Sequence, residues 1–218
     1  MIETTFEPGL LGQRCWLELA SGERINLATE RWRSTPSPGD ELLLRHCVGP
    51  TLDIGCGPGR LTAALTERGV IALGTDISPV AVRLTREAGA VAIRRDVFDE
   101  QPGEGRWQHT LLADGNIGIG GNPVRLLTRV RNLLHDNGSA LVEIDPPGVG
   151  LRHGRVRVST GDASDGRWFD WAWLGADAVA DTARRAGLTP KWIRPAGDRW
   201  FTELIPTGGG SWSTHRAG

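Results

Sequence analysis

Three aspartates, Asp53, Asp76 and Asp96, each stand within or just after a short apolar run of the kind that forms buried strands. The first precedes a turn whose glycines are spaced G-x-G-x-G, inside LDIGCGPGR at positions 52–60. Glycine lets the chain turn sharply and leaves no side chain in a ligand's way. A carboxylate beside this turn can accept hydrogen bonds from a cationic amino group, whereas it would repel a pyrophosphate. The pattern favours a ligand with an amino group over a dinucleotide; the alternative is a tight turn that binds nothing.

The second and third aspartates are spaced for the other parts of an adenosyl compound. Asp76 ends the run VIALGTD about 20 residues beyond the glycine turn, where an acid can accept hydrogen bonds from ribose hydroxyls. Ile77 follows it, and Ser78-Pro79 predicts the start of a helix. Asp96 can accept from the exocyclic amine of adenine while the backbone N–H of Val97 donates to the ring. Amino group, ribose and adenine together indicate S-adenosylmethionine, although either acid alone could be merely solvated.

These motifs make the chain similar to the class I S-adenosylmethionine-dependent methyltransferases of the small bacterial, methyltransferase-domain type. The similarity is most specific over positions 50–146, where the family's glycine-loop motif matches LDIGCGPGR and its motif after the fourth strand matches LLADGNIG. The resemblance implies that S-adenosylmethionine is the cofactor, with its methionine part near Asp53 and its ribose held by Asp76. The full set of expected cofactor-binding residues is Asp53, Gly55, Cys56, Gly57, Gly59, Asp76, Ile77, Asp96, Val97, Ala113 and Asp114.

From Thr51 onward, strand and helix patterns alternate, as in a parallel sheet with helices between its strands. The predicted fold class is α/β: a Rossmann-like, doubly wound, mostly parallel sheet, for which the resemblance implies seven strands with an antiparallel last strand. Outside this core we expect an N-terminal hairpin and an inserted β-hairpin after strand 5. The predicted strands are 51–55, 70–75, 91–94, 108–113, 139–144, 191–196 and 199–206, and the predicted helices are 40–47, 59–68, 79–88, 122–135 and 176–186.

A chain of 218 residues with 39% hydrophobic content can bury one sizeable core, so we expect a single methyltransferase domain over 1–218. The run WLELASGERINL predicts a hairpin outside the cofactor core, and GRVRVSTGDASDGRWFDWAWLG predicts another beside the pocket, which we interpret as an acceptor lid. The expected parts are an N-terminal hairpin and cap (1–48), the cofactor-binding core (49–146), the inserted hairpin (150–174), the last helix and antiparallel strand pair (175–206), and a mobile tail (207–218).

Chemistry is expected at the carboxyl ends of the strands, where open α/β sheets bind ligands. Asp114 and Asn116, which follow the fourth strand, are candidate catalytic residues, and Asp114 is the first candidate for the group that takes or orients the acceptor's proton, unless it contacts the cofactor instead. His153, at the entrance to the inserted hairpin, is a weaker second candidate. The candidate substrate-binding residues are Trp32, Arg33, Asp145, Arg152 and Trp171, for which packing, capping or a solvated surface is the alternative.

The formal net charge of −1 gives no bulk field to attract a polyanion, so a nucleic-acid partner is disfavoured. The amino terminus lacks a signal-peptide pattern and no stretch approaches a membrane span, which indicates a cytoplasmic protein without a membrane partner. Cys15, Cys47 and Cys56 include no C-x-x-C pair, which argues against disulfides and a zinc site, so no metal is expected. The oligomeric state stays open.

The predicted function is transfer of a methyl group from S-adenosylmethionine to an O or N acceptor on a small molecule, in specialised metabolism. Methyl transfer is an in-line displacement, so the protein contributes mostly by alignment in a dry pocket. Two alternatives stay open: an enzyme that uses S-adenosylmethionine for a cyclisation or rearrangement without methylating, and a catalytically silent S-adenosylmethionine-binding regulator or partner subunit. A NAD-dependent reductase is disfavoured by the G-x-G-x-G spacing and by Asp53.

Overall fold

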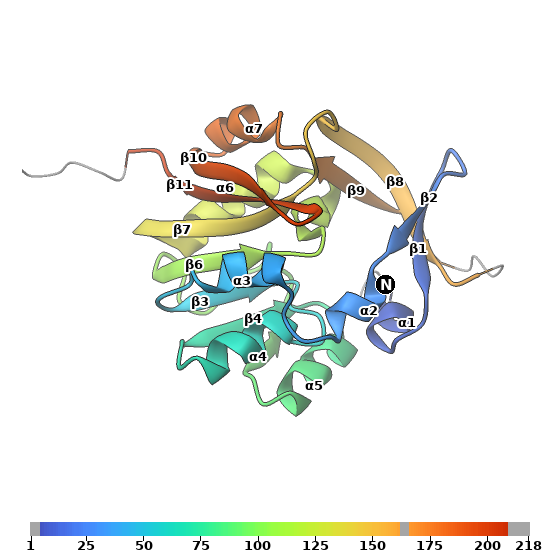
Figure 1. The fold of residues 1–218 in the computed structure, drawn as a ribbon, viewed down its shortest axis with the longest axis horizontal. Helices are drawn as coiled ribbons and strands as arrows, with labels where there is room; N and C mark the ends of the chain where they lie inside the picture. Colours follow the sequence, from blue (N-terminus) through green and yellow to red (C-terminus); the bar gives the residue numbers. More distant parts are fainter. Residues whose placement is uncertain (1–4, 162–165, 209–218) are drawn as a thin grey trace, which may run out of the picture.

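Within residues 5–161 and 166–208, which the computed structural model describes, seven strands form a central sheet (Figure 1). They are β3 (Thr51–Ile54), β4 (Ala72–Asp76), β5 (Ala92–Arg94), β6 (Trp107–Leu112), β7 (Leu134–Ile144), β10 (Leu188–Ala196) and β11 (Arg199–Pro206). Their order across the sheet is β10-β11-β7-β6-β3-β4-β5. The neighbouring pairs from β7 to β5 are parallel, and β11 is antiparallel to both β10 and β7. This arrangement confirms the predicted Rossmann-like α/β fold with an antiparallel last strand.

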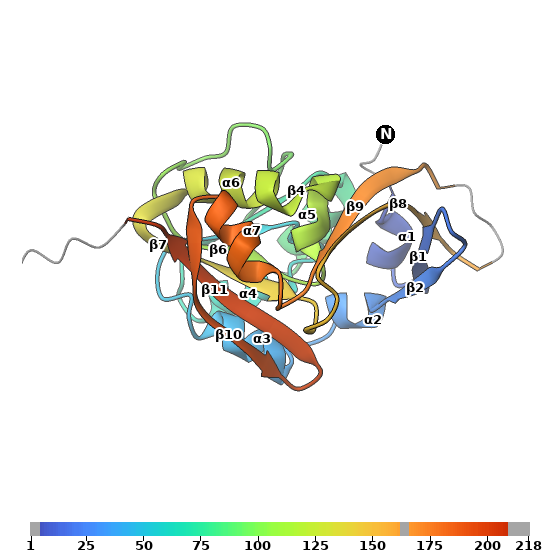
Figure 2. The same ribbon diagram turned by 90° about the horizontal axis from the view of Figure 1, so that it is seen from above.

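Helices cover both faces of the central sheet, as Figure 2 shows from above. α3 (Pro38–Leu44) and α4 (Arg60–Glu67) pack on one face, and α6 (Pro123–Leu133) and α7 (Val179–Arg185) pack on the other. α5 (Pro79–Glu87) packs beside β4 and β5. Apolar side chains fill both layers, so a strand such as β3 is buried along its whole length, as expected for a parallel sheet between helices.

The start of α5 confirms the helix predicted to begin at Ser78-Pro79, whereas α3 begins at Pro38 and not at the predicted residue 40. The side chains of Ser37, Ser78 and Asn122 accept hydrogen bonds from backbone N–H groups in the first turns of α3, α5 and α6. Each of these helices carries a proline in its first turn. The end of α6 differs from the prediction: β7 begins directly after it at Leu134, and not at 139, because the backbone of Leu134 is extended and pairs with Trp107.

A second sheet joins the two hairpins that the sequence predicts as separate units. Its strands are β1 (Cys15–Leu19), β2 (Arg24–Leu27), β8 (Leu151–Ser159) and β9 (Phe169–Leu174), in the order β2-β1-β8-β9. β1 pairs antiparallel with β8, which places Leu17 opposite Val158. Apolar side chains from β1, β8 and β9 form a core of their own. The inserted hairpin is therefore part of a sheet that the N-terminal hairpin completes.

Three short elements have no counterpart in the predicted pattern: α1 (Glu7–Leu10), α2 (Thr29–Trp32) and the 3₁₀ helix η2 (Asn116–Gly121). α1 and α2 lie beside the second sheet (Figure 1), and η2 packs along β9. Residues 162–165 of the inserted hairpin and 209–218 of the predicted mobile tail lie outside the described residues, as do 1–4. No helix in the described part of the chain is long and apolar enough to cross a membrane.

Candidate active site

A cavity of about 1040 Å³ lies between the carboxyl edge of the central sheet and the second sheet. One side is made by residues at or after the ends of β3, β4, β5 and β6, and the other by residues of α1, β2, α2 and β9. Open α/β sheets bind ligands at this edge, and the volume is at the upper end of the range for small-molecule sites. The predicted site residues that line it are Trp32, Asp53, Gly55, Cys56, Gly57, Asp76, Ile77, Asp96, Val97, Ala113, Asp114, Asn116 and Trp171.

The glycine turn after β3 has a left-handed backbone at Gly55, Gly57 and Gly59, with φ of +69°, +55° and +91°. A Cβ at Gly59 would lie 2.8 Å from the Cα of Thr85, so glycine here lets α5 approach the start of α4. A Cβ at Gly57 would meet only Leu10, at 3.7 Å, and would otherwise stand in the cavity. Gly57 therefore leaves room for a ligand, whereas Gly59, which does not line the cavity, serves the packing of two helices.

Asp53 is 3% exposed and lines the cavity. Its Oδ2 accepts a hydrogen bond from the Thr62 hydroxyl at 2.6 Å, while its Oδ1 accepts none from any described residue. Burial raises the pKa of Asp53 to about 6, against the lowering effect of the Thr62 hydrogen bond. A cationic amino group beside Oδ1 would favour the ionised carboxylate and oppose this shift. The site therefore fits the amino group of the predicted cofactor.

Asp76, at the end of β4, is bound to two backbone turns. Its Oδ2 accepts from the N–H of Gly57 at 3.1 Å, and its Oδ1 accepts from the N–H of Ser78 at 2.8 Å. Burial raises the pKa of this carboxyl, while the backbone hydrogen bonds lower it. Asp76 and Ile77 both line the cavity. Loss of this carboxylate would therefore change the shape of the glycine turn as well as remove an acceptor for ribose hydroxyls.

After β5, Asp96 forms a tight turn in which its Oδ1 accepts from the N–H of Phe98 at 2.9 Å. Val97 and Phe98 both line the cavity, and the guanidinium of Arg125 lies 3.9 Å from the centroid of the Phe98 ring. Phe98 and Arg125 line the cavity but are not among the predicted site residues. Because Phe98 directly follows the predicted residue Val97, it could have been predicted as a site residue too. Arg125 belongs to α6, and only the fold brings it to this place.

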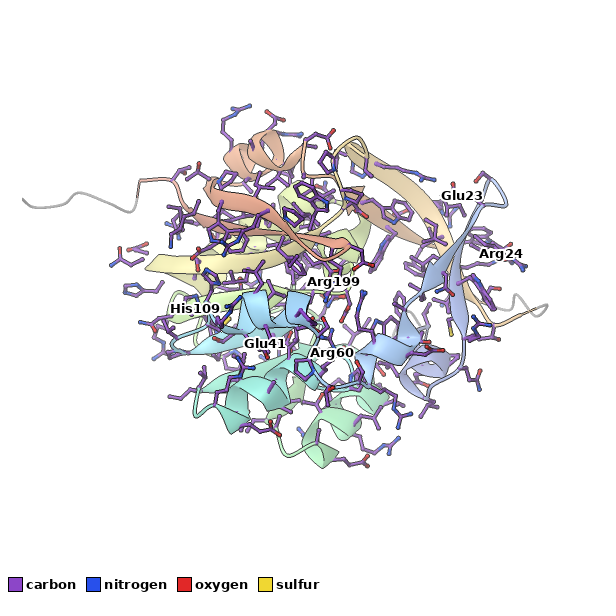
Figure 3. All side chains as sticks on the ribbon, viewed as in Figure 1. Glu23, Arg24, Glu41, Arg60, His109 and Arg199 are labelled. Carbon is purple, nitrogen blue, oxygen red and sulfur yellow. The ribbon has the colours of Figure 1, made fainter. Side chains whose placement is uncertain are left out.

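A group of charged side chains beside the cavity forms what we call the ion network. Arg60 pairs with Asp40, and Arg199 holds both Asp40, with Nη1 2.9 Å from Oδ1, and Glu143, with Nη2 2.6 Å from Oε2. Burial opposes ionisation of Arg60, Arg199 and Asp40, but their mutual hydrogen bonds and charges outweigh it: the pKa values of Arg60 and Arg199 are raised, and that of Asp40 is held well below its usual range. Figure 3 shows Arg60 and Arg199 in the interior of the molecule. The members of the ion network are Arg31, Arg60, Arg199, Asp40, Asp114 and Glu143.

Asp114 has both carboxylate oxygens engaged in the ion network. Its Oδ1 accepts from Nε of Arg31 at 2.8 Å, and its Oδ2 pairs with Arg60. The backbone of Asp114 is left-handed, with φ of +54°, and its N–H donates to Oε2 of Glu143 at 2.5 Å. Asp114 lines the cavity, as a catalytic residue would. However, Arg31 and Arg60 occupy its two carboxylate oxygens, so neither oxygen can accept the acceptor's proton in this arrangement.

The side chain of Asn116 is also engaged. Its Nδ2 donates to the carbonyl oxygens of Ile54 and Gly55, at 2.9 Å each. A Cβ at Gly55 would lie 2.7 Å from this Nδ2, so the absence of a side chain at Gly55 admits the amide. Asn116 begins η2, and its amide therefore ties the segment after β6 to the end of β3. In this arrangement Asn116 positions the glycine turn.

Four further predicted residues, Arg33, Asp145, Arg152 and His153, are not brought to the cavity lining. Arg33 is exposed just after α2. The other three have partners around the second sheet: Asp145 Oδ2 accepts from the N–H of Leu174 at 3.2 Å, Arg152 Nη2 donates to Glu23 Oε2 at 2.5 Å, and His153 Nδ1 lies 2.8 Å from the carbonyl oxygen of Gly121. Burial raises the pKa of Asp145. In the described part of the chain, no group of three or more His, Cys, Asp or Glu side chains is arranged to hold a metal ion.

Part of the cavity lining is apolar, and we call it the apolar wall; its Leu10 comes close to the glycine turn at Gly57. The ring centroid of Phe6 lies 5.8 Å from that of Trp171 and 6.4 Å from that of Trp32. Phe6 is a lining residue that the sequence analysis does not name, because a single phenylalanine near the amino end belongs to no pattern. The apolar wall consists of Phe6, Leu10, Leu27, Trp32, Ile119, Phe169 and Trp171.

Comparisons with known proteins agree with this geometry. Residues 52–102 match a protein-family model described as a methyltransferase domain. A trans-aconitate 2-methyltransferase of Rhodococcus jostii (strain RHA1) is 47% identical over 53 residues, which are 23% of this chain and 21% of that protein. A tabtoxin biosynthesis enzyme of Pseudomonas amygdali pv. tabaci is 29% identical over 140 residues, which are 62% of this chain and 52% of that enzyme. The chain thus spans about a fifth and about half of the lengths of these two relatives.

The fold is also similar to that of solved structures. A SAM-dependent methyltransferase from Bacteroides fragilis, in complex with S-adenosyl-L-homocysteine, matches with a TM-score of 0.73 and 18% identity, over 94% of each chain. The matched domain and this fold confirm the predicted resemblance. Residues 52–102 thus resemble a methyltransferase domain, and the chain has a Rossmann-like architecture similar to that of a SAM-dependent methyltransferase.

Proposed function

We propose that this class I methyltransferase domain binds S-adenosylmethionine and transfers the methyl group to an oxygen or nitrogen of a small molecule. The observation that carries the proposal is the cavity, which sets the predicted cofactor residues on one side and the apolar wall on the other. The names of the trans-aconitate 2-methyltransferase and the tabtoxin biosynthesis enzyme support a small-molecule acceptor, and the second supports specialised metabolism. The predicted cytoplasmic location belongs to the same proposal.

The cofactor side of the cavity fits S-adenosylmethionine. The free Oδ1 of buried Asp53 can accept from an ammonium group, and the bare turn at Gly57 leaves space beside it. Ile77 and Phe98 offer apolar surface for adenine. When bound, S-adenosylmethionine supplies a methyl group on a sulfonium sulfur, which an oxygen or nitrogen lone pair takes in a displacement that leaves a neutral thioether.

The chain's own residues would act mainly by alignment and by exclusion of water. The apolar wall can hold the acceptor against the cofactor side, and such positioning is worth several orders of magnitude in rate. Because Arg31 and Arg60 occupy both oxygens of Asp114, we expect the acceptor's proton to leave to solvent unless Arg31 moves away. Arg31 is the most exposed of the three arginines in the ion network, with 28% of its side chain accessible.

Calorimetry with S-adenosylhomocysteine and a methyl-transfer assay with labelled S-adenosylmethionine and a fractionated metabolite extract test the proposal. We expect binding and a methylated small molecule. A product made without methylation would favour the cyclisation or rearrangement alternative. Binding without any product would favour a silent regulator or partner subunit. Preferential binding of NADH would overturn the assignment of the cofactor.

Asp114→Asn tests the chemical step. If Asp114 takes the acceptor's proton after Arg31 moves, kcat falls by about 10² while the affinity for S-adenosylhomocysteine hardly changes. A matched control is Glu143→Gln, which removes a charge from the same ion network at a residue that does not line the cavity. Equal losses in both variants would indicate that the network only supports the fold. A loss of cofactor affinity with kcat preserved would place Asp114 in the cofactor site.

A further inference from the structure

The apolar wall contains an indole N–H that bonds to no described residue. Trp171 is 9% exposed, yet its Nε1 donates to no described residue. Two other tryptophans are bonded: Trp107, which is 8% exposed, donates from Nε1 to the carbonyl oxygen of Pro102 at 2.8 Å, and Trp192 donates to Glu203 at 2.7 Å. Among the described residues, the fully buried polar atoms without a partner do not include Nε1 of Trp171, so this N–H is open to solvent, and a ligand oxygen or nitrogen in the cavity can replace water as its acceptor.

The free N–H of Trp171 lies next to the segment that follows Asp114. A Cβ at Gly118 would be 2.5 Å from Nε1 of Trp171, so the indole packs on η2 only because residue 118 has no side chain. The same η2 begins at Asn116, which is bonded to the glycine turn. Trp171 lines the cavity, and its indole N–H lies against η2, the segment that follows Asp114.

Three of the four ring pairs described in the apolar wall pack edge to face, and the fourth, Phe6 with Trp171, is tilted at 50°. The Phe6 ring makes an interplanar angle of 67° with Trp32 and 69° with Phe169, and Phe169 makes an angle of 88° with Trp171. In each edge-to-face pair, one ring keeps both faces clear of that neighbour, and all four aromatic residues line the cavity. The rings come from beside α1, from α2 and from β9, which lie at the same end of the molecule (Figure 1). A planar ligand matches such surfaces better than a branched aliphatic one.

The charges near the apolar wall do not favour an ionic ligand. The ion network combines three arginines with three acids and is electrically balanced. Asp170, which lines the cavity between Phe169 and Trp171, is exposed and therefore solvated. Neither a cation nor an anion gains a buried, unbalanced counter-charge at this wall.

From these observations we propose that the acceptor is an aromatic or heteroaromatic small molecule, one of whose oxygen or ring nitrogen atoms accepts a hydrogen bond from the indole N–H of Trp171. The ring lies against the apolar wall, and its O–H or N–H nucleophile points to the cofactor side. The role of this molecule as methyl acceptor rests on the proposed function, whereas its binding does not. An experiment can therefore contradict the binding of this molecule and its role as methyl acceptor separately.

Nuclear magnetic resonance of the ¹⁵N-labelled protein, saturated with S-adenosylhomocysteine, tests the binding directly. The chain has nine tryptophans, and Trp171→Phe assigns the indole cross-peak of Trp171 by its disappearance. The probes are catechol and 4-hydroxyquinoline, with cyclohexane-1,2-diol as the saturated counterpart of catechol. We expect both aromatic probes to shift the Trp171 cross-peak and to bind at least ten-fold more tightly than the diol. The absence of a shift with both aromatic probes, or equal binding of the diol, would show that the wall only packs the two sheets together.

Two variants separate the hydrogen bond from the ring. Trp171→Phe keeps an aromatic ring and removes the N–H, so the affinity for 4-hydroxyquinoline should fall by about three- to ten-fold, while the affinity for S-adenosylhomocysteine stays within two-fold. Trp173→Phe is the matched control, because Trp173 lies two positions along the same strand and does not line the cavity. Its probe affinity should match that of the unaltered chain. Equal affinities in both variants would overturn the assigned hydrogen bond, and a failure of S-adenosylhomocysteine to bind at all would overturn the proposed function instead.

Discussion

The two sides of the cavity are built in opposite ways. Most of the cofactor side comes from one stretch, 53–98, in which Asp53, Gly57 and Asp76 are held by local turns and by neighbouring parallel strands, and Ala113 and Asp114 complete it after β6. The apolar wall comes from residues as far apart as Phe6 and Trp171, and it depends on pairing between β1 and β8. Substitutions in the distant segments that form the apolar wall can therefore leave the local motif of the cofactor side unchanged. Under the proposed function, this arrangement separates the binding of the cofactor from the choice of the acceptor.

That separation is open to experiment, since changes on the cofactor side should lower the affinity for S-adenosylhomocysteine and changes on the second sheet should not. The largest effect is expected for Gly57→Val. The new side chain would stand in the cavity at a backbone with φ of +55°, and we expect the affinity to fall by about 100-fold or more. Calorimetry measures it. Gly89→Val is the matched control: Gly89 has φ of +82° and no atom within 4 Å of a Cβ, and it does not line the cavity. Similar losses of affinity in both variants would contradict a cofactor at the glycine turn.

Asp76→Ala should have the next largest effect. It removes an acceptor for ribose hydroxyls and also the two hydrogen bonds that Asp76 accepts from Gly57 and Ser78. A hydrogen bond to a charged group is worth about 1.5 to 3 kcal/mol, so the affinity should fall about ten-fold or more. Asp136→Ala, at a side chain that is 84% exposed, controls for the loss of one negative charge. Unchanged affinity in Asp76→Ala would remove Asp76 from the cofactor site.

The pH dependence of cofactor binding should report on Asp53. Its pKa of about 6 lies above the ordinary value of 3.8, so the free folded protein holds more protons than the unfolded chain between about pH 4 and 6. The contribution of Asp53 to stability therefore falls as the pH rises through this window. A bound ammonium group favours the carboxylate, so the affinity for S-adenosylhomocysteine should rise about ten-fold from pH 5 to pH 7. Asp53→Asn should flatten the profile; a profile that keeps its slope in this variant would assign the effect to another group.

The smallest effect is expected for Arg152→Gln on the outer side of the second sheet. Arg152 and its partner Glu23 are 41% and 48% exposed, and exposed ion pairs contribute at most about 1 kcal/mol. Cofactor affinity and turnover should change less than two-fold, and the melting temperature by no more than a few degrees. A large rise in the KM for the acceptor would return Arg152 to the acceptor site that the sequence predicts for it.

Much of the cofactor side could be predicted because its causes are local. Successive strands of a parallel sheet end at the same edge, so the three apolar runs that carry Asp53, Asp76 and Asp96 bring these acids to one cavity. Phe98 directly follows the predicted residue Val97, so its place in the cavity lining could also have been predicted. The places of Arg125 and Phe6 could not have been predicted in this way, because each lies in a segment that only the packing of the whole chain brings to the cavity.

The sequence by itself determined the order of strands and helices, the capped helix starts and the shape of the glycine turn, because each depends on residues a few positions apart. Tertiary structure alone decided that the two hairpins form one sheet, since strand pairing between β1 and β8 leaves no trace in either segment. It also decided the state of Asp114. The sequence marks that carboxylate as a candidate base, but Arg31 and Arg60, 83 and 54 residues away along the chain, occupy both of its oxygens once the chain is folded. Charge pairing acts through space, and the sequence shows only which charges exist.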